Sequence, residues 1–140
     1  MRTRFLFIAA LLAFTACGSS DNSLAPTSVG VFTITDLTVG TGATAASGNR
    51  ITVNYAGFLY DTSKTDGKGN GFDSNSSYQF TLGAGTVIAG WDQGIVGMKI
   101  GGRRRLIIPP ALAYGSGTPD ATKIPPNATL VFDVGLISIP

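Results

Sequence analysis

The segment Val87–Met98 (VIAGWDQGIVGM) decides which fold this chain adopts. Its large apolar residues recur at intervals of three, four and three positions: Ile88, Trp91, Ile95 and Met98. That spacing places them on one face of a helix. Three glycines inside the segment lower its intrinsic helix propensity. We therefore predict one short helix that is held in place by packing.

On both sides of this helix, apolar and polar side chains alternate in the manner of half-buried strands. The short apolar run 106–108 is followed by Pro109 and Pro110. Proline has no backbone N–H, so these two residues cannot continue the hydrogen bonding of a strand. The pattern predicts an α+β domain in which an antiparallel sheet packs against the helix. The strand segments expected are 31–36, 51–55, 79–82, 106–108 and 130–136.

The N-terminal residues read as an export signal. Residues 1–16 have a basic start, a short apolar run and small residues at their end, which is typical of a signal peptide. The single cysteine, Cys17, follows directly and resembles the acylated cysteine of a bacterial lipobox. Residues 18–30 are small and polar, so we predict that residues 17–30 are a lipidated cysteine with a flexible tether. An ordinary signal peptide with an incidental cysteine is the alternative.

These features predict an exported protein of the bacterial cell envelope. Lipidated Cys17 would anchor it to a membrane, on the periplasmic side if the cell is Gram-negative. Residues 31–140 would form the folded domain.

Composition excludes several function classes. The chain has no histidine and one cysteine, which removes most routes to metal or haem ligation and to Ser-His-Asp or Cys-His catalysis. We expect no metal and no cofactor. Without the signal peptide, eight basic residues face eight acidic ones. Arg103–Arg105 would point to alternating faces of a strand in a solvated or edge position, so nucleic acid is not an expected partner.

Six short motifs occur along the chain in the order and approximate spacing of one family. Together they cover roughly residues 35–140, and they resemble those of FKBP-type peptidyl-prolyl cis-trans isomerases. The motifs are Val53–Gly57, Phe72–Ser74, Val87–Gly94, Gly102–Pro110, Ala113–Gly115 and Ile124–Phe132.

The resemblance implies a curved antiparallel sheet wrapped around one short helix, with an apolar pocket between them. The backbone N–H of Ile88 and the hydroxyl of Tyr114 would donate hydrogen bonds to substrate carbonyls. A core role alone would explain aromatic and aliphatic residues such as Phe80 and Val87. The implied catalytic residues are Tyr55, Phe72, Asp73, Trp91, Tyr114 and Phe132, and the implied substrate-binding residues are Tyr78, Phe80, Val87, Ile88 and Ile124.

The function implied is isomerisation of X–Pro bonds in envelope or secreted proteins, through non-covalent stabilisation of the twisted amide. Proline-containing polypeptides, macrolide inhibitors and a membrane are the partners implied, and a monomer is expected. A chaperone or adaptor that binds proline segments with little turnover is one alternative. A purely structural envelope lipoprotein, whose pocket no longer has a function, is another alternative.

Three features depart from the family pattern. Residues 61–71 lack apolar side chains and contain three glycines, which predicts an inserted loop or bulge. The stretch from Asp73 to Tyr78 is short, so an arginine that often pairs with this aspartate in longer relatives has no counterpart. Lys123 precedes Ile124 at a position that is commonly apolar.

Overall fold

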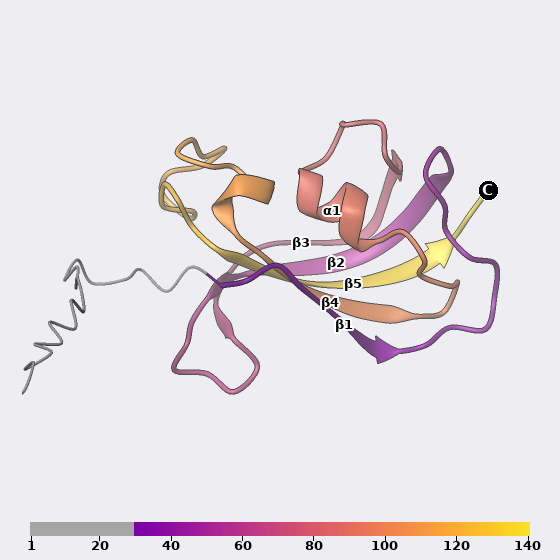
Figure 1. Ribbon diagram of the computed structural model, residues 1–140, viewed down its shortest axis with the longest axis horizontal. Coiled ribbons are helices and arrows are strands. Elements are labelled where there is room, and N and C mark those ends of the chain that lie inside the picture. Colours follow the sequence, from indigo (N-terminus) through magenta and orange to yellow (C-terminus); the bar gives the residue numbers. More distant parts are fainter. Residues whose placement is uncertain (1–29) are drawn as a thin grey trace, which may run out of the picture.

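The computed structural model describes residues 30–140 (Figure 1). The predicted signal peptide, Cys17 and residues 18–29 lie outside this range. Within residues 30–140, no helix is long and apolar enough to cross a membrane. The elements are β1 (Thr33–Thr38), β2 (Arg50–Tyr60), β3 (Lys68–Thr81), α1 (Ala89–Gly94), β4 (Arg103–Ile108), the 3₁₀ helix η1 (Pro110–Leu112) and β5 (Leu130–Ser138).

The strands form one curved antiparallel sheet in the order β1-β4-β5-β2-β3, and α1 packs over one face of it (Figure 1). This confirms the predicted α+β class. The strand at the centre, β5, is buried from Leu130 to Leu136. The core fills the space between β5, its neighbours and α1, where Ile51, Leu106 and Ile95 have no exposed surface. Apolar side chains that leave water in this way supply most of the stabilisation of such a domain.

Helix α1 is shorter than the apolar spacing suggested. It ends at Gly94, and Met98 is buried beyond it, after a backbone reversal at Gly97, whose φ is +91°. A left-handed φ of this kind ends a helix, and glycine adopts it without steric cost. At Gly90 a Cβ atom would lie 2.5 Å from Ile108. The glycine content therefore lets the helix backbone approach β4 closely.

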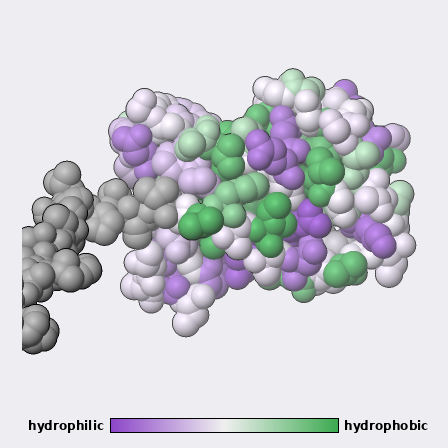
Figure 2. Space-filling model, viewed as in Figure 1, coloured by the Kyte–Doolittle hydropathy of each residue, from purple (hydrophilic) through white to green (hydrophobic). Residues whose placement is uncertain are grey.

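Strand β1 starts and ends two residues later than the predicted 31–36, and it is not half-buried. All six of its residues are exposed, with Ile34 at 45% and Leu37 at 41%. It lies at the edge of the sheet and pairs only with β4. Figure 2 shows apolar side chains along its position on the face in view. An alternation of apolar and polar residues indicates which side chains share a face of a strand. It does not show whether another layer of the protein covers that face.

The predicted loop at 61–71 is partly strand. Strand β2 continues to Tyr60, and β3 starts at Lys68, so the turn is confined to residues 61–67. Residues 79–81 of the predicted strand 79–82 are the end of this 14-residue strand, and Leu82 lies in the turn after it. The pairing of β2 with β3 shifts register at three points. Backbone hydrogen bonds at a sheet edge need no apolar side chain, so the polar sequence concealed this extension.

The three arginines of β4 face alternately, as predicted, but Arg104 is not solvated. Its side chain is only 11% exposed. It donates to the carbonyls of Gly94 and Val96, at the end of α1, and pairs with Asp36 of β1. These contacts supply donors for carbonyl groups that the helix leaves unpaired. Arg104 therefore connects β1, β4 and α1.

Gly30 is the first residue that the structure describes, and it packs against the folded domain. Gly30, assigned to the tether from the sequence, is buried, and its N–H donates to Thr129 Oγ1. A Cβ atom at this position would lie 2.8 Å from Ile107 Cγ2, so a larger residue would not fit without a shift.

Candidate active site

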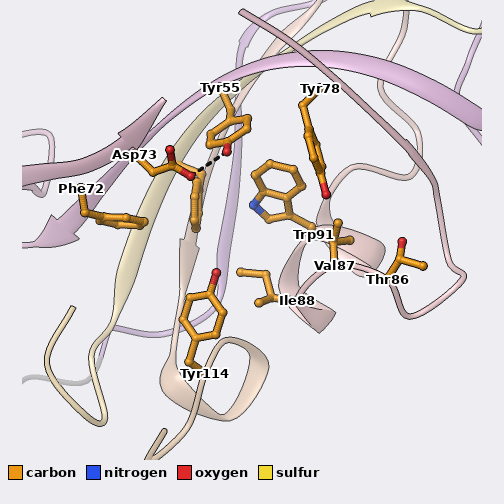
Figure 3. A pocket seen from close by; sticks show the side chains of 10 residues that line it. Tyr55, Phe72, Asp73, Tyr78, Thr86, Val87, Ile88, Trp91 and Tyr114 are labelled. Carbon is orange, nitrogen blue, oxygen red and sulfur yellow. Dashed lines mark hydrogen bonds between the residues drawn. The ribbon is translucent and has the colours of Figure 1, made fainter. Parts of the chain in front are cut away.

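A hollow of about 410 Å³ opens between the sheet and α1 (Figure 3). Every strand from β2 onward except β4 contributes to its wall, together with α1, the loop before it and the segment after η1. Nine of the eleven pocket residues predicted from the sequence line it. The lining residues are Tyr55, Phe72, Asp73, Tyr78, Thr86, Val87, Ile88, Trp91, Tyr114 and Phe132.

The indole of Trp91 forms the floor of this pocket. Trp91 is 5% exposed, and the rings of Tyr55 and Phe132 stand edge-on to it with centroids at 4.9 and 5.2 Å. Its Nε1 is buried without a hydrogen-bond partner among residues 30–140. The faces of neighbouring aromatic rings can accept a hydrogen bond from this N–H only weakly. The floor is therefore a buried aromatic surface that carries one unpartnered N–H.

The upper wall carries a tyrosine–aspartate pair. The hydroxyl of Tyr55 donates to Asp73 Oδ2 at 2.7 Å (Figure 3). Burial raises the pKa of Tyr55 well above its ordinary value, and the hydrogen bond to Asp73 and the charge of that carboxylate raise it further. The phenol therefore stays protonated and orients the carboxylate at the pocket edge.

The loop before α1 is held by Asp92. Its two carboxylate oxygens accept hydrogen bonds from the N–H groups of Gly83 and Gly85 at 2.8 and 3.0 Å. Ile88, the N-cap residue, is extended with φ −60° and ψ 149°. Its carbonyl accepts from Trp91 N–H, while no hydrogen bond within residues 30–140 engages its own N–H. The loop thus presents an available backbone donor at the pocket wall.

Tyr114 stands across the pocket from Asp73, and its hydroxyl points into the hollow (Figure 3). Burial raises its pKa, with smaller contributions from Asp73 and Tyr78. Within the described part of the chain, its hydroxyl has no hydrogen-bond partner. It is therefore a protonated donor that a bound peptide carbonyl could use.

Two predicted residues lie behind the pocket, and one lining residue was missed. Phe80 is 5% exposed and stacks on Tyr78 at 5.7 Å, so it supports the wall from the core. Ile124, predicted in the wall, is 4% exposed, belongs to the core and is not among the residues that line the pocket. Thr86 lines the pocket. Its place directly before Val87 was the only available signal, because a lone threonine in a loop indicates no chemistry.

Residues 30–140 contain no group of three or more possible metal-ligating side chains. The arrangement instead offers an aromatic surface, a carboxylate at the rim and two donors on opposite sides. It can hold a small apolar ring and the peptide groups that flank it.

Comparisons with known proteins agree on one class. The sequence model for FKBP-type peptidyl-prolyl cis-trans isomerases matches residues 42–137. The FK506-binding protein of Streptomyces anulatus is 44% identical over 110 residues, which cover 76% of this chain and 84% of that protein. The crystal structure of AtFKBP13 superposes with a TM-score of 0.65 at 37% identity, over 78% of this chain and 93% of that one.

Some relatives are much longer. The FK506-binding protein 4 of Neurospora crassa is 48% identical over 110 residues, and this chain spans only 22% of its length. The region matched by the family model, residues 42–137, contains β2, β3, α1, β4, all but the last residue of β5, and the pocket. The chain belongs to the FKBP-type peptidyl-prolyl cis-trans isomerase family.

Proposed function

We propose that this chain accelerates cis-trans isomerisation of X–Pro peptide bonds. The observation that carries the proposal is the aromatic hollow floored by Trp91, with its size of about 410 Å³ and its rim of polar donors. A proline ring is a small apolar group that a peptide can present to such a surface. The family and the named relatives support the same activity.

The reaction requires no bond to be made or cut. Rotation disrupts amide resonance against a barrier of roughly 18–20 kcal/mol, and uncatalysed exchange takes tens to hundreds of seconds. The twisted amide is less polar than the planar one, so a water-poor aromatic pocket favours it. Stronger binding of the transition state than of the ground state is what lowers the barrier.

The two donors hold the peptide while the bond turns. The Ile88 N–H and the Tyr114 hydroxyl, neither of them hydrogen-bonded within the described residues, donate hydrogen bonds to peptide carbonyl groups on either side of the proline. The ring rests on Trp91, between Tyr55 and Phe132. Orientation of this kind restricts motion before the reaction and leaves only the rotation itself to be completed.

A protease-coupled assay on a short X-Pro peptide tests the proposal. The full chain should increase the rate constant of the slow phase of cleavage, which reports cis-to-trans conversion, in proportion to its concentration. Peptide binding without acceleration would favour the chaperone or adaptor alternative instead. We further propose that the pocket accepts macrolides such as the FK506 for which the relatives are named, so FK506 should inhibit the acceleration.

Activity should vary little with pH near neutrality. The chain has no histidine, and the raised pKa values of Tyr55 and Tyr114 keep both phenols protonated as the pH increases. We expect kcat/KM to stay within about twofold from pH 6 to 8.5, because no general acid or base takes part. The same assay in overlapping buffers measures it, and a bell-shaped profile would show that proton transfer contributes.

We also propose that the chain is an exported, monomeric lipoprotein of the bacterial envelope. Its support is the sequence of residues 1–17, where the only cysteine follows a signal-like segment. Cys17→Ala should move the protein from the membrane to the soluble fraction while isomerase activity persists. Fractionation followed by blotting measures this, with Ser19→Ala as the matched control. Membrane retention of the Cys17 variant would contradict lipid anchoring.

A further inference from the structure

The pocket contains one charged side chain. Asp73 stands at its rim, and every other lining residue is aromatic, aliphatic or a hydroxyl-bearing threonine (Figure 3). No lysine or arginine is among the lining residues. A peptide that places its proline on Trp91 therefore meets an acidic rim.

No cation of the described chain neutralises this carboxylate. The ion pairs within residues 30–140 join Arg104 to Asp36, Arg105 to Asp133, and Lys68 to Asp133 and Asp66. None of them involves Asp73, which is exposed and accepts a hydrogen bond from the neutral Tyr55 hydroxyl. Its negative charge thus remains available to a bound molecule.

The charge of Asp73 is felt across the pocket. It contributes to the raised pKa of Tyr55 beside it and also to that of Tyr114, on the opposite wall. Asp73 is exposed at the open rim, so solvent weakens this interaction without abolishing it. A flanking side chain of a bound peptide therefore enters a negative potential.

We propose that this pocket selects proline segments that carry lysine or arginine next to the proline. The inference rests on the proposed isomerase function and names its substrate class. A cationic side chain at the rim pairs with Asp73, while a glutamate at the same position is repelled. Exposed ion pairs change equilibria by roughly 1.5- to 5-fold, so we expect a preference of about that size for lysine over norleucine.

The test measures kcat/KM of the full chain by NMR exchange spectroscopy, which needs no protease. Peptides differ only in lysine, norleucine or glutamate, placed before the proline in one series and after it in another. At low salt, lysine should exceed norleucine and norleucine should exceed glutamate in at least one series. In 1 M NaCl, where the Debye length falls to about 3 Å, the preference should collapse.

Two pocket variants separate charge from hydrogen bonding. Asp73→Asn still accepts from Tyr55 but should lose the order of the three peptides. Tyr55→Phe removes the hydroxyl and should retain that order. Asp36→Asn, on the distant strand β1, is the matched control for a lost carboxylate and should also retain it.

The outcomes distinguish this inference from the function on which it rests. If lysine does not exceed norleucine at low salt in either series, or if the order of the three peptides is unchanged in Asp73→Asn, the substrate preference is overturned and the isomerase function stands. Failure to accelerate any peptide overturns both.

Discussion

Trp91→Ala should remove nearly all isomerase activity, with a fall in kcat/KM of at least about 100-fold, because the surface that binds the twisted amide is lost. The indole contacts Tyr55, Tyr78, Phe80 and Phe132. Its removal takes away the floor and lets water reach the bound amide. A peptide isomerisation assay on the purified variant measures the loss.

The same change also destabilises the fold, so a matched control is needed. Truncation of a buried aromatic residue costs about 3–5 kcal/mol. Leu136→Ala truncates another buried core residue, 2% exposed, on the part of β5 beyond Phe132. It should lose comparable stability in urea unfolding yet keep most of its activity while folded. Equal activity losses in the two folded variants would mean that Trp91 has no special role.

Asp133→Asn should cause the largest loss of stability among the charged residues. Asp133 is 6% exposed, and its carboxylate accepts hydrogen bonds from Arg105 Nε at 2.7 Å and from Lys68 Nζ at 3.2 Å. Breaking a fully buried pair costs 3–5 kcal/mol. Because the Arg105 and Lys68 side chains are 21% and 24% exposed, water compensates in part, and we expect about 2 kcal/mol in urea unfolding.

Asp36→Asn is the matched control for this change. It alters the other cross-strand carboxylate–arginine pair, but Asp36 is 48% exposed, so the loss should stay below about 1 kcal/mol. Similar losses in the two variants would show that burial of Asp133 contributes nothing.

The Asp133 effect should depend on pH in a defined direction. Burial alone would raise the pKa of Asp133, but hydrogen bonds from Arg105 and Lys68 outweigh it and hold the pKa below its usual range. The stabilisation is therefore complete above the unfolded-state value of about 3.9 and is lost as the pH falls through the lower native value. The stability difference between wild type and Asp133→Asn should be constant from pH 5 to 7 and shrink below about pH 4.

Much of the fold could be predicted because local patterns mark the elements, although the structure buries every residue of β5 from Leu130 to Leu136 and not only alternate ones. The spacing of Ile88, Trp91 and Ile95 marked the helix, and the alternation from Leu130 to Leu136 marked the central strand. Each pattern reflects a side chain that packs against another layer. The resemblance to the family then allowed the pocket to be predicted, because its motifs contain Tyr55, Trp91 and Phe132 in the family's order along the chain.

The remaining features depend on contacts that a single segment cannot report. The exposure of β1 follows from its edge position, and the length of β3 follows from backbone pairing across a polar sequence. Ile124 resembles a wall residue in type, yet it lies in the core behind the wall, where only Phe80 was expected. Arg104 looked like a surface residue because only the folded chain brings the end of α1 over β4.

The central claim is that a proline amide turns faster when its ring rests on Trp91. The most direct measurement is an NMR exchange spectrum of an X-Pro peptide with a small amount of the full chain, recorded together with the Trp91 indole signal. The proposal predicts strong cis-trans exchange peaks and a shift of the indole N–H in the same titration. Peptide exchange at the uncatalysed rate, with the indole signal unmoved at saturating peptide, would contradict it.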